Sequence, residues 1–505
     1  MNAATVLTAL APLTAYAPQI VLLVGMFCVL ALGMARPMQA WSIRFITLFS
    51  IGAALLSTTL LVVDNADRPG VAGPEVWIEP PVLTGVGSGS AIASAPPDDG
   101  HWEPGPRIAA HGPLVAVDDK SIGWQVIAYL ACLPLAFCLR GRDDAFAALF
   151  LGSALGVGLL SVSATLPMLF IALELMSLPA YLMVARSRPG RGALEGAIKY
   201  FFAGGLAGAL YLMGMALYYA GQRTLGGSGD LAPLGQAGAG LMCAAALFKL
   251  GAVPFHWWLP DAYEAAAPEV SGYLSTAMKA AAVLFLMRLC DLFPAAQVLR
   301  VLPAVGAITA LVGAALALRQ SNLQRLFAYS SVSHAGILIL GVGAWARGGR
   351  DAAGTVALVF YLAAYALMSN GAFLAIKASG CSTRAQLKGL GRRAPGLAGA
   401  FAALTLALAG IPPTGGFFAK FLVFWRALDV GLVAPTIACG LASLLSLGYY
   451  LAIVRDLYFD EPEDGAPAPL AGVTAMVIAC AAGALALGAA PWFLVGVPLG
   501  GGFGR

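Results

Sequence analysis

The chain has 505 residues, of which 60% are hydrophobic and only 11% are charged. Soluble proteins carry about a quarter charged residues, so this composition excludes soluble enzymes, nucleic-acid-binding proteins and secreted disulfide scaffolds. The net charge of +4 comes from 29 basic and 25 acidic residues, and their positions are more informative than their sum. We therefore expect an all-α polytopic membrane protein with no nucleic-acid partner.

Long apolar runs predict about 14 transmembrane helices, because about 20 apolar residues span a bilayer core. The first eighteen residues contain no Lys or Arg, so we expect the first run to be a retained helix and not a signal peptide. The predicted crossings are 19–35, 45–63, 122–139, 145–163, 167–185, 197–220, 236–258, 270–290, 301–318, 323–346, 352–376, 396–428, 432–454 and 470–494.

One polar segment interrupts this series. Residues 64–120 contain nine Pro, eight Gly and nine acidic residues, a composition that favours neither a crossing nor a long helix. We expect an external loop at 64–121, after two N-terminal helices at 1–63. A third helix with its loop follows at 122–144, and the last loop and helix occupy 455–505.

Basic residues are distributed unequally between the two sets of loops. Loops after odd-numbered helices hold 15 of them, and the other loops with the C-terminus hold 10. The bias is clearest in two short loops, around 186–191 and 377–393. Because cytoplasmic loops are enriched in Lys and Arg, we predict that these loops are cytoplasmic and that both termini are periplasmic.

Five charged residues remain in the apolar runs after those in loops and at helix ends are set aside. The acid is Glu174, and the bases are Lys199, Lys249, Lys279 and Lys420. A charge at the bilayer centre costs about 2.5–3.5 kcal/mol on insertion scales, so these residues indicate a function or strong pairing. All four bases are lysines, and a desolvated lysine can lose its proton whereas arginine stays charged. The pattern predicts a proton relay in which an approaching carboxylate keeps a lysine charged and a retreating one releases its proton.

Structural alternatives stay open for each of these residues. Lys199 follows Glu195 by four positions, which equally predicts a surface ion pair on one helix face. Lys420 lies six residues before Arg426 and could extend its ammonium group toward water. A structural scaffold, in which paired lysines only hold helices together, is a third possibility.

Prolines predict breaks beside two of the lysines. Pro254 follows Lys249 by five positions, and Pro412 and Pro413 precede Lys420. Broken helices at membrane depth are tolerated where they line a hydrated cavity, as in transporters.

Histidine and cysteine are sparse. His256 and His334 lie in predicted helices and could extend a relay, although a histidine that is simply hydrogen-bonded within the bundle fits as well. The eight cysteines form no C-x-x-C pair and the four histidines are scattered, so we expect no metal and no redox cofactor on this chain.

Several sequence strings resemble the antiporter-like membrane subunits of respiratory complex I, the NADH-quinone oxidoreductase. They are LELMSLP at 173–179, EGAIKYF at 195–201, FKLGAVPFHW at 248–257, LSTAMK at 274–279, NLQRLFAYSSVSH at 322–334 and GIPPTGGFFAKF at 410–421. The resemblance extends from about residue 120 to 460. Within the family the N-type branch fits best, since no lateral helix follows residue 494 and a lysine stands at position 420 where M-type subunits carry an acid.

The resemblance implies a fold and site residues. It implies two inverted five-helix repeats, at 145–290 and 301–454, with the seventh and twelfth helices broken. By resemblance, Glu174 is the glutamate of helix five, Lys199 its partner on helix six, Lys249 the central lysine, Lys279 the connecting lysine and Lys420 the terminal lysine. The same likeness makes His256 and His334 supporting relay or hydration residues.

The implied function is proton translocation in the membrane arm, coupled to quinone reduction elsewhere in the complex. NADH, FMN, Fe–S clusters and quinone are then expected on partner subunits, and the chain is expected in a bacterial inner membrane. The implied neighbours are an M-type subunit, small K-, J- and A-type subunits, and lipids. A subunit of a multisubunit sodium/proton antiporter, or of a hydrogenase-like or ferredoxin-driven pump, is the alternative.

Overall fold

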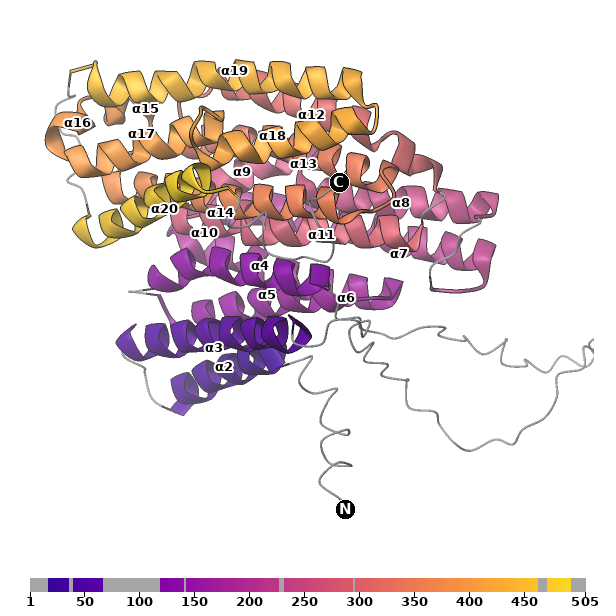
Figure 1. Ribbon diagram of the computed structural model, residues 1–505. Helices are drawn as coiled ribbons and strands as arrows, with labels where there is room; N and C mark the ends of the chain where they lie inside the picture. Colours follow the sequence, from indigo (N-terminus) through magenta and orange to yellow (C-terminus); the bar gives the residue numbers. More distant parts are fainter. Residues whose placement is uncertain are drawn as a thin grey trace, which may run out of the picture.

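The computed structural model describes residues 17–35, 40–66, 119–139, 142–226, 231–293, 296–461 and 470–491. The external loop expected at 64–121 lies mostly outside these residues. All described elements are helices, and they form one bundle in which α2 and α3 lie at one edge and α19 at the opposite edge (Figure 1). The expectation of an all-α chain is confirmed.

Every predicted crossing coincides with a helix or an interrupted helix. Among the described residues, nine helical stretches are long and apolar enough to span a membrane, and the other predicted runs contain shorter apolar helices. The long elements are α2 (Ala17–Ala35), α3 (Ala40–Ala66), α4 (Asp119–Phe137), α5 (Asp144–Val162), α6 (Leu166–Ser187), α7 (Arg191–Gln222), α8 (Pro233–Leu250), α11 (Ala277–Leu292), α12 (Leu302–Ala317), α13 (Leu323–Arg347), α14 (Ala352–Ser379), α17 (Pro395–Ala409), α18 (Gly415–Asp429), α19 (Val433–Tyr458) and α20 (Ala471–Ala489).

Short elements complete the described chain. They are η1 (Phe255–Trp257), α9 (Trp258–Ala265), α10 (Pro268–Ser275), η2 (Gln297–Arg300), α15 (Arg384–Leu387) and α16 (Leu390–Arg393). The run predicted at 270–290 is divided between α10 and α11 at Thr276, an interruption that the sequence analysis did not predict. The inverted relationship of the two five-helix segments stays a prediction.

The predicted breaks beside two lysines are confirmed. α8 ends at Leu250, directly after Lys249, and α17 ends at Ala409 before α18 brings in Lys420. Each helix stops at a glycine in the left-handed conformation, with φ of 69° at Gly251 and 87° at Gly410. Glycine adopts this conformation at little cost, so the helices end a few residues before the prolines that predict the breaks.

Glycines permit close contact between neighbouring helices. A Cβ atom on Gly336 of α13 would meet backbone atoms of Gly306 and Ala310 on α12, and one on Gly313 would meet the backbone of Ser333. Small residues at such contacts are typical of membrane bundles, in which helices associate largely by close packing.

The two basic loops lie at the same end of the bundle. Arg142, after α4, donates to the backbone oxygen of Ser187 and to Glu269 at the start of α10. Lys377, near the end of α14, pairs with the same Glu269. Loops that follow odd-numbered predicted helices therefore meet, as alternating crossings require. Whether this end faces the cytoplasm stays a prediction.

Replacing Gly336 by leucine is expected to separate α12 from α13. The new side chain would clash with backbone atoms of α12, which cannot move aside as a flexible side chain can. Overpacking of this kind costs about 1–3 kcal/mol or more. We expect Gly336→Leu to lower the fraction of extracted protein that stays monodisperse on heating, measured by size-exclusion chromatography. Gly205→Leu is the matched control, since nothing lies within 4 Å of a Cβ built there. Equal losses in the two variants would contradict this packing account.

Candidate functional site

Lys249 is held against one face of α6. Its ammonium group donates to Ser177 Oγ at 2.9 Å and to Tyr181 OH at 3.0 Å, and it lies 3.9 Å from Glu174 Oε1. These three residues follow helical spacing and so share a face of α6. The lysine side chain is only 5% exposed. Because the carboxylate lies beyond hydrogen-bond distance, the hydroxyls hold the amine while Glu174 acts on it as a nearby charge.

Lys199 has partners other than the one that the resemblance implies. Its Nζ lies 2.8 Å from Glu195 Oε1 and 3.0 Å from Asp261 Oδ2, and its side chain is 42% exposed. The implied partnership with Glu174 is therefore corrected. Glu174 faces Gly208, nine residues further along α7, which is about 14 Å along a helix axis. The same-helix pair with Glu195, the alternative left open by the sequence, is present.

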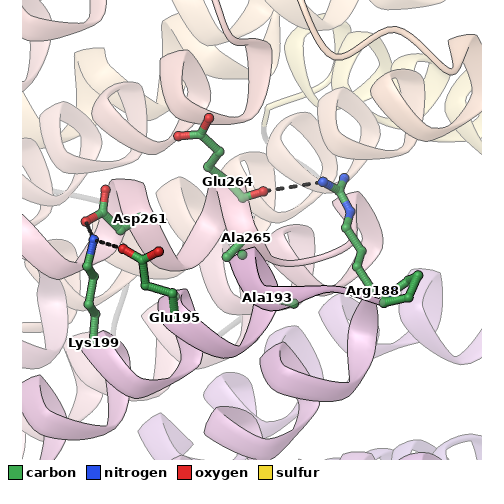
Figure 2. Close-up of a pocket in the computed structure, with 10 residues that line it drawn as sticks. Arg188, Ala193, Glu195, Lys199, Asp261, Glu264 and Ala265 are labelled. Atoms are coloured by element: carbon green, nitrogen blue, oxygen red, sulfur yellow. Dashed lines mark hydrogen bonds and ion pairs between the residues drawn. The ribbon is translucent and has the colours of Figure 1, made fainter.

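Acids of α9 join Lys199 to Arg325 on α13. Arg325 Nη1 lies 2.7 Å from Asp261 Oδ1 and 2.9 Å from Glu264 Oε2, so Asp261 bridges two cations. A cavity of about 370 Å³ opens beside them and is also lined by Arg188 and Glu195. Figure 2 shows Lys199 between Glu195 and Asp261, with Arg188 directed at the backbone oxygen of Glu264. Sequence reasoning missed Asp261, although its three-residue spacing from Glu264 places both on one helix face.

Lys279 is buried among neutral groups. The residue is 3% exposed, and its ammonium group donates to both the backbone oxygen and the hydroxyl of Ser331 on α13. Tyr365 OH, from α14, donates to the same hydroxyl at 3.0 Å. Among the described residues no carboxylate pairs with Lys279. The ring of Tyr365 is a further neighbour, with its centroid 5.8 Å from the ammonium group.

Lys420 uses the carbonyl groups that the helix break leaves free. It is 7% exposed and donates to the backbone oxygens of Leu408 at 3.0 Å and Ala409 at 2.8 Å. The last carbonyls of a helix have no partner within it, and the C-terminal end of a helix carries partial negative charge. The break at Gly410 thus creates the binding site for the lysine that follows.

The two histidines differ in their surroundings. His334 is buried, with Nδ1 at 2.7 Å from Tyr361 OH and its ring centroid 4.9 Å from that of Tyr365. Tyr365 thus connects the surroundings of His334 with Ser331 and Lys279. His256 lies in η1, and its buried Nδ1 has no hydrogen-bond partner among the described residues.

Lys249 and Lys279 line a shared small cavity. Its volume is about 20 Å³, and Tyr200, Trp258 and Tyr263 also line it. A polar cavity of this size holds about one water molecule. The two lysines therefore border one space that is large enough for a water molecule.

Three further buried charged residues lie in helices that the sequence analysis treated as carrying charges only at their ends, and one of them is Asp456 of α19, whose side chain is 2% exposed. Glu269 of α10 has a side chain only 1% exposed, and Arg288 of α11 is buried and donates to the backbone oxygen of Ser161 at 3.0 Å. The inference that Glu174 is the one buried acid is therefore corrected. Counting distance from the end of an apolar run does not reveal how neighbouring helices cover that end.

Cysteine and potential metal ligands show no clustering in the described part of the chain. All eight cysteines are free thiols, and seven of them are buried. No group of three or more His, Cys, Asp or Glu side chains with a geometry suited to a metal ion occurs among the described residues.

Removing the charge of Asp261 tests the bridge between α7, α9 and α13. Asp261→Asn leaves Lys199 with Glu195 and Arg325 with Glu264, and we expect a loss of about 1–2 kcal/mol of stability because the pairs are partly exposed. Thermal unfolding in detergent measures this loss. Asp429→Asn, which changes an exposed partner of Arg426, is the control and is expected to have little effect. Equal decreases in the unfolding temperature of the two variants would argue against the bridge.

Comparisons with known proteins identify the family. A family model described as "NADH:quinone oxidoreductase/Mrp antiporter, TM" matches residues 163–446. NADH-quinone oxidoreductase subunit N of Thiobacillus denitrificans is 39% identical over 350 residues, which are 65% of this chain and 71% of that protein. Subunit N of Halorhodospira halophila is 35% identical over 402 residues, covering 73% and 81% of the two chains.

Solved structures show the same fold. A chain of respiratory complex I from Thermus thermophilus with bound aureothin matches with a TM-score of 0.76 and 29% identity, covering 95% of this chain and 98% of that one. A chain of the Mrp complex from Dietzia sp. DQ12-45-1b matches with a TM-score of 0.79 at 22% identity, covering 96% of each, and this shows the fold alone. The chain therefore belongs to the NADH:quinone oxidoreductase/Mrp antiporter family, among the relatives named NADH-quinone oxidoreductase subunit N.

Proposed function

We propose that this chain is a proton-translocating subunit in the membrane arm of an NADH-quinone oxidoreductase of a bacterial inner membrane. The observation that carries the proposal is the way in which Lys249, Lys279 and Lys420 are buried. Each ammonium group is held by hydroxyls or backbone oxygens, and only Lys249 has a carboxylate within ion-pair distance among the described residues. These amines are therefore suited to exist both with and without their proton.

The Glu174–Lys249 pair is the proposed switch. At about 4 Å, with an effective dielectric constant near 20, such a pair is worth about 4 kcal/mol, enough to decide whether a buried amine keeps its proton. When Glu174 moves away, the ammonium group loses the attraction of the carboxylate. The proton then passes through water in the shared cavity to Lys279.

The second half of the path uses hydroxyl groups. From Lys279 the proton moves by way of the Ser331 and Tyr365 hydroxyls, and then through water beside His334 to Lys420. We propose that Lys199, at the 370 Å³ cavity, takes part at the exposed end, and that His256 supports hydration beside the α8 break. The two segments 145–290 and 301–454 are then the inverted repeats, each with its fourth helix broken.

Electron transfer belongs to other subunits in this proposal. NADH, FMN, Fe–S clusters and quinone are bound by partners, and the complex as a whole is the enzyme. An M-type subunit and small K-, J- and A-type subunits are the proposed neighbours, and both termini are proposed to be periplasmic. The sodium/proton antiporter and the hydrogenase-like or ferredoxin-driven pump are supported here by fold alone, since the Mrp chain and an archaeal sulfane sulfur reductase chain are only 22% and 20% identical.

Removing either member of the switch is expected to reduce proton pumping. In an assembled complex, Lys249→Ala or Glu174→Ala lowers proton translocation about tenfold or more, since each removes a group that accepts or holds the transferred proton. Quenching of a pH-sensitive dye in vesicles during NADH oxidation measures the effect. Lys388→Ala is the matched control, because that lysine pairs with Asp460 at 3.7 Å outside the proposed path. Wild-type pumping in both switch variants would refute the proposal.

A substitution that keeps the positive charge at position 420 distinguishes a proton-relay role of Lys420 from a structural scaffold role. Lys420→Arg keeps a cation that can bond to carbonyl groups, but arginine does not release its proton. A scaffold role predicts that Lys420→Arg restores the activity lost in Lys420→Ala. The relay predicts that both variants lose pumping while the amount of assembled complex, measured on native gels, stays close to wild type in Lys420→Arg. Full activity of the arginine variant would contradict the relay.

A further inference from the structure

A second cavity lies at the basic end of the bundle and shares Arg188 with the cavity beside Lys199. Its volume is about 320 Å³, and its lining includes Arg142, Arg188, Glu269, Gln324, Lys377 and Leu470. These residues come from the ends of α4, α6 and α14 and from the starts of α10, α13 and α20. We refer to this cavity as the basic-end pocket.

The basic-end pocket has more positive than negative charge. Arg142 and Lys377 both pair with Glu269 Oε1, at 3.0 Å and 2.7 Å. Arg188 donates to Gln324 Oε1 at 2.6 Å and to the backbone oxygen of Glu264 at 3.4 Å, and no carboxylate of the described residues pairs with it. Burial lowers the pKa of the Arg188 guanidinium from its ordinary value, while the nearby charge of Glu269 opposes this change. Three cations and one acid leave two positive charges, which favours an anionic ligand.

The same pocket contains an acceptor without a donor. Glu269 Oε2 is buried and has no hydrogen-bond partner among the described residues, because both cations bind the other oxygen. A buried carboxylate oxygen without a partner is costly and calls for a donor. The pocket therefore suits a group that combines an anion with an O–H or N–H donor, as the headgroups of phosphatidylglycerol and phosphatidylethanolamine do.

The surface beside the pocket suits acyl chains. Leu470 lines the pocket and is 51% exposed, and Ile478 and Leu485 on α20 are exposed as well. Ile478 follows Leu470 by eight positions, and Leu485 follows Ile478 by seven. Each spacing is about two helical turns, so the three residues form one apolar strip that begins at the pocket. α20 packs on α14 and α17 at the outside of the bundle (Figure 1). A free phosphate ion would leave this strip unused, whereas a phospholipid covers it.

We propose that the basic-end pocket binds one phospholipid, with the phosphate on the Arg188 guanidinium, the headgroup donor on Glu269 Oε2 and an acyl chain along Leu470, Ile478 and Leu485. Basic pockets between transmembrane helices are a general mode of lipid headgroup recognition. The proposal goes beyond proton transfer, because none of these residues belongs to the proposed relay. A bound lipid of this kind joins α6, α10 and α20 at one end of the bundle.

Photo-crosslinking in the intact purified complex tests the site. A phosphatidylglycerol with a carbene-forming group in its acyl chain is added after delipidation, and labelled peptides are mapped by mass spectrometry. We expect labelling of the segment 470–485, reduced about tenfold in Arg188→Gln, since a charge-assisted bond of this kind is worth at least a factor of ten. Arg191→Gln is the matched control, because Arg191 is an exposed cation at the start of α7 that does not line the pocket.

Competition between the probe and unlabelled lipids for the unmodified complex needs no variant, and it tests which class of lipid binds. Unlabelled phosphatidylglycerol and phosphatidylethanolamine are expected to displace the probe several-fold better than phosphatidylcholine, which has no donor for Glu269, and inorganic phosphate is expected to fail. Unchanged labelling in Arg188→Gln, an equal loss in Arg191→Gln, or labelling confined to a partner subunit would overturn the lipid site. Equal competition by phosphatidylcholine or by inorganic phosphate would overturn it too.

Discussion

The cost of placing ammonium groups inside a bilayer governs this structure. Each buried lysine has its own solution: Lys249 uses two hydroxyls and a nearby carboxylate, Lys279 uses Ser331, and Lys420 uses the last carbonyls of α17. In the last case the carbonyl groups that the helix break leaves free are the hydrogen-bond acceptors for the lysine. A helix break leaves backbone carbonyl groups without hydrogen-bond donors, which is unfavourable in lipid. A cation that donates hydrogen bonds to these carbonyl groups offsets that cost. The fold and the proposed site therefore depend on each other.

The partners of a cation divide the charged residues into two classes. At the basic end of the bundle, Arg142, Arg325 and Lys377 each contact a carboxylate at 3.0 Å or less. Deeper in the bundle, the ammonium groups of Lys279 and Lys420 donate only to neutral oxygens among the described residues, and that of Lys279 also lies over the Tyr365 ring. A cation without a counter-charge in a low-dielectric interior is the one whose proton is most easily removed. The structure thus separates charges that hold helices from charges suited to proton transfer.

Much of the fold follows from the sequence, because apolar runs and helix-breaking residues are local signals. The runs predict the positions of the crossings, and Pro254 and Pro412 predict the two breaks to within a few residues. The depth of Lys249 and Lys279 follows from the same runs, whereas for Lys420 the sequence leaves an ammonium group extended toward water as an alternative. Long-range contacts do not follow. The pairing of Lys199 with Asp261 depends on how α9 packs against α7. The grouping of Ser331, Tyr365 and His334 depends on the packing of α11, α13 and α14. The burial of Glu269 depends on residues after α4 and at the end of α14, which cover the start of α10.

The central claim is that buried amines change protonation during turnover. Infrared difference spectroscopy of the intact complex, with lysine labelled by ¹⁵N and with Lys279→Arg and Lys420→Arg as reference variants, tests it directly. We expect isotope-sensitive ammonium bands to appear and disappear between the oxidised and the NADH-reduced complex, and to be lost in the reference variants. An ammonium spectrum that is the same in both states, in a complex that pumps protons, would contradict the account.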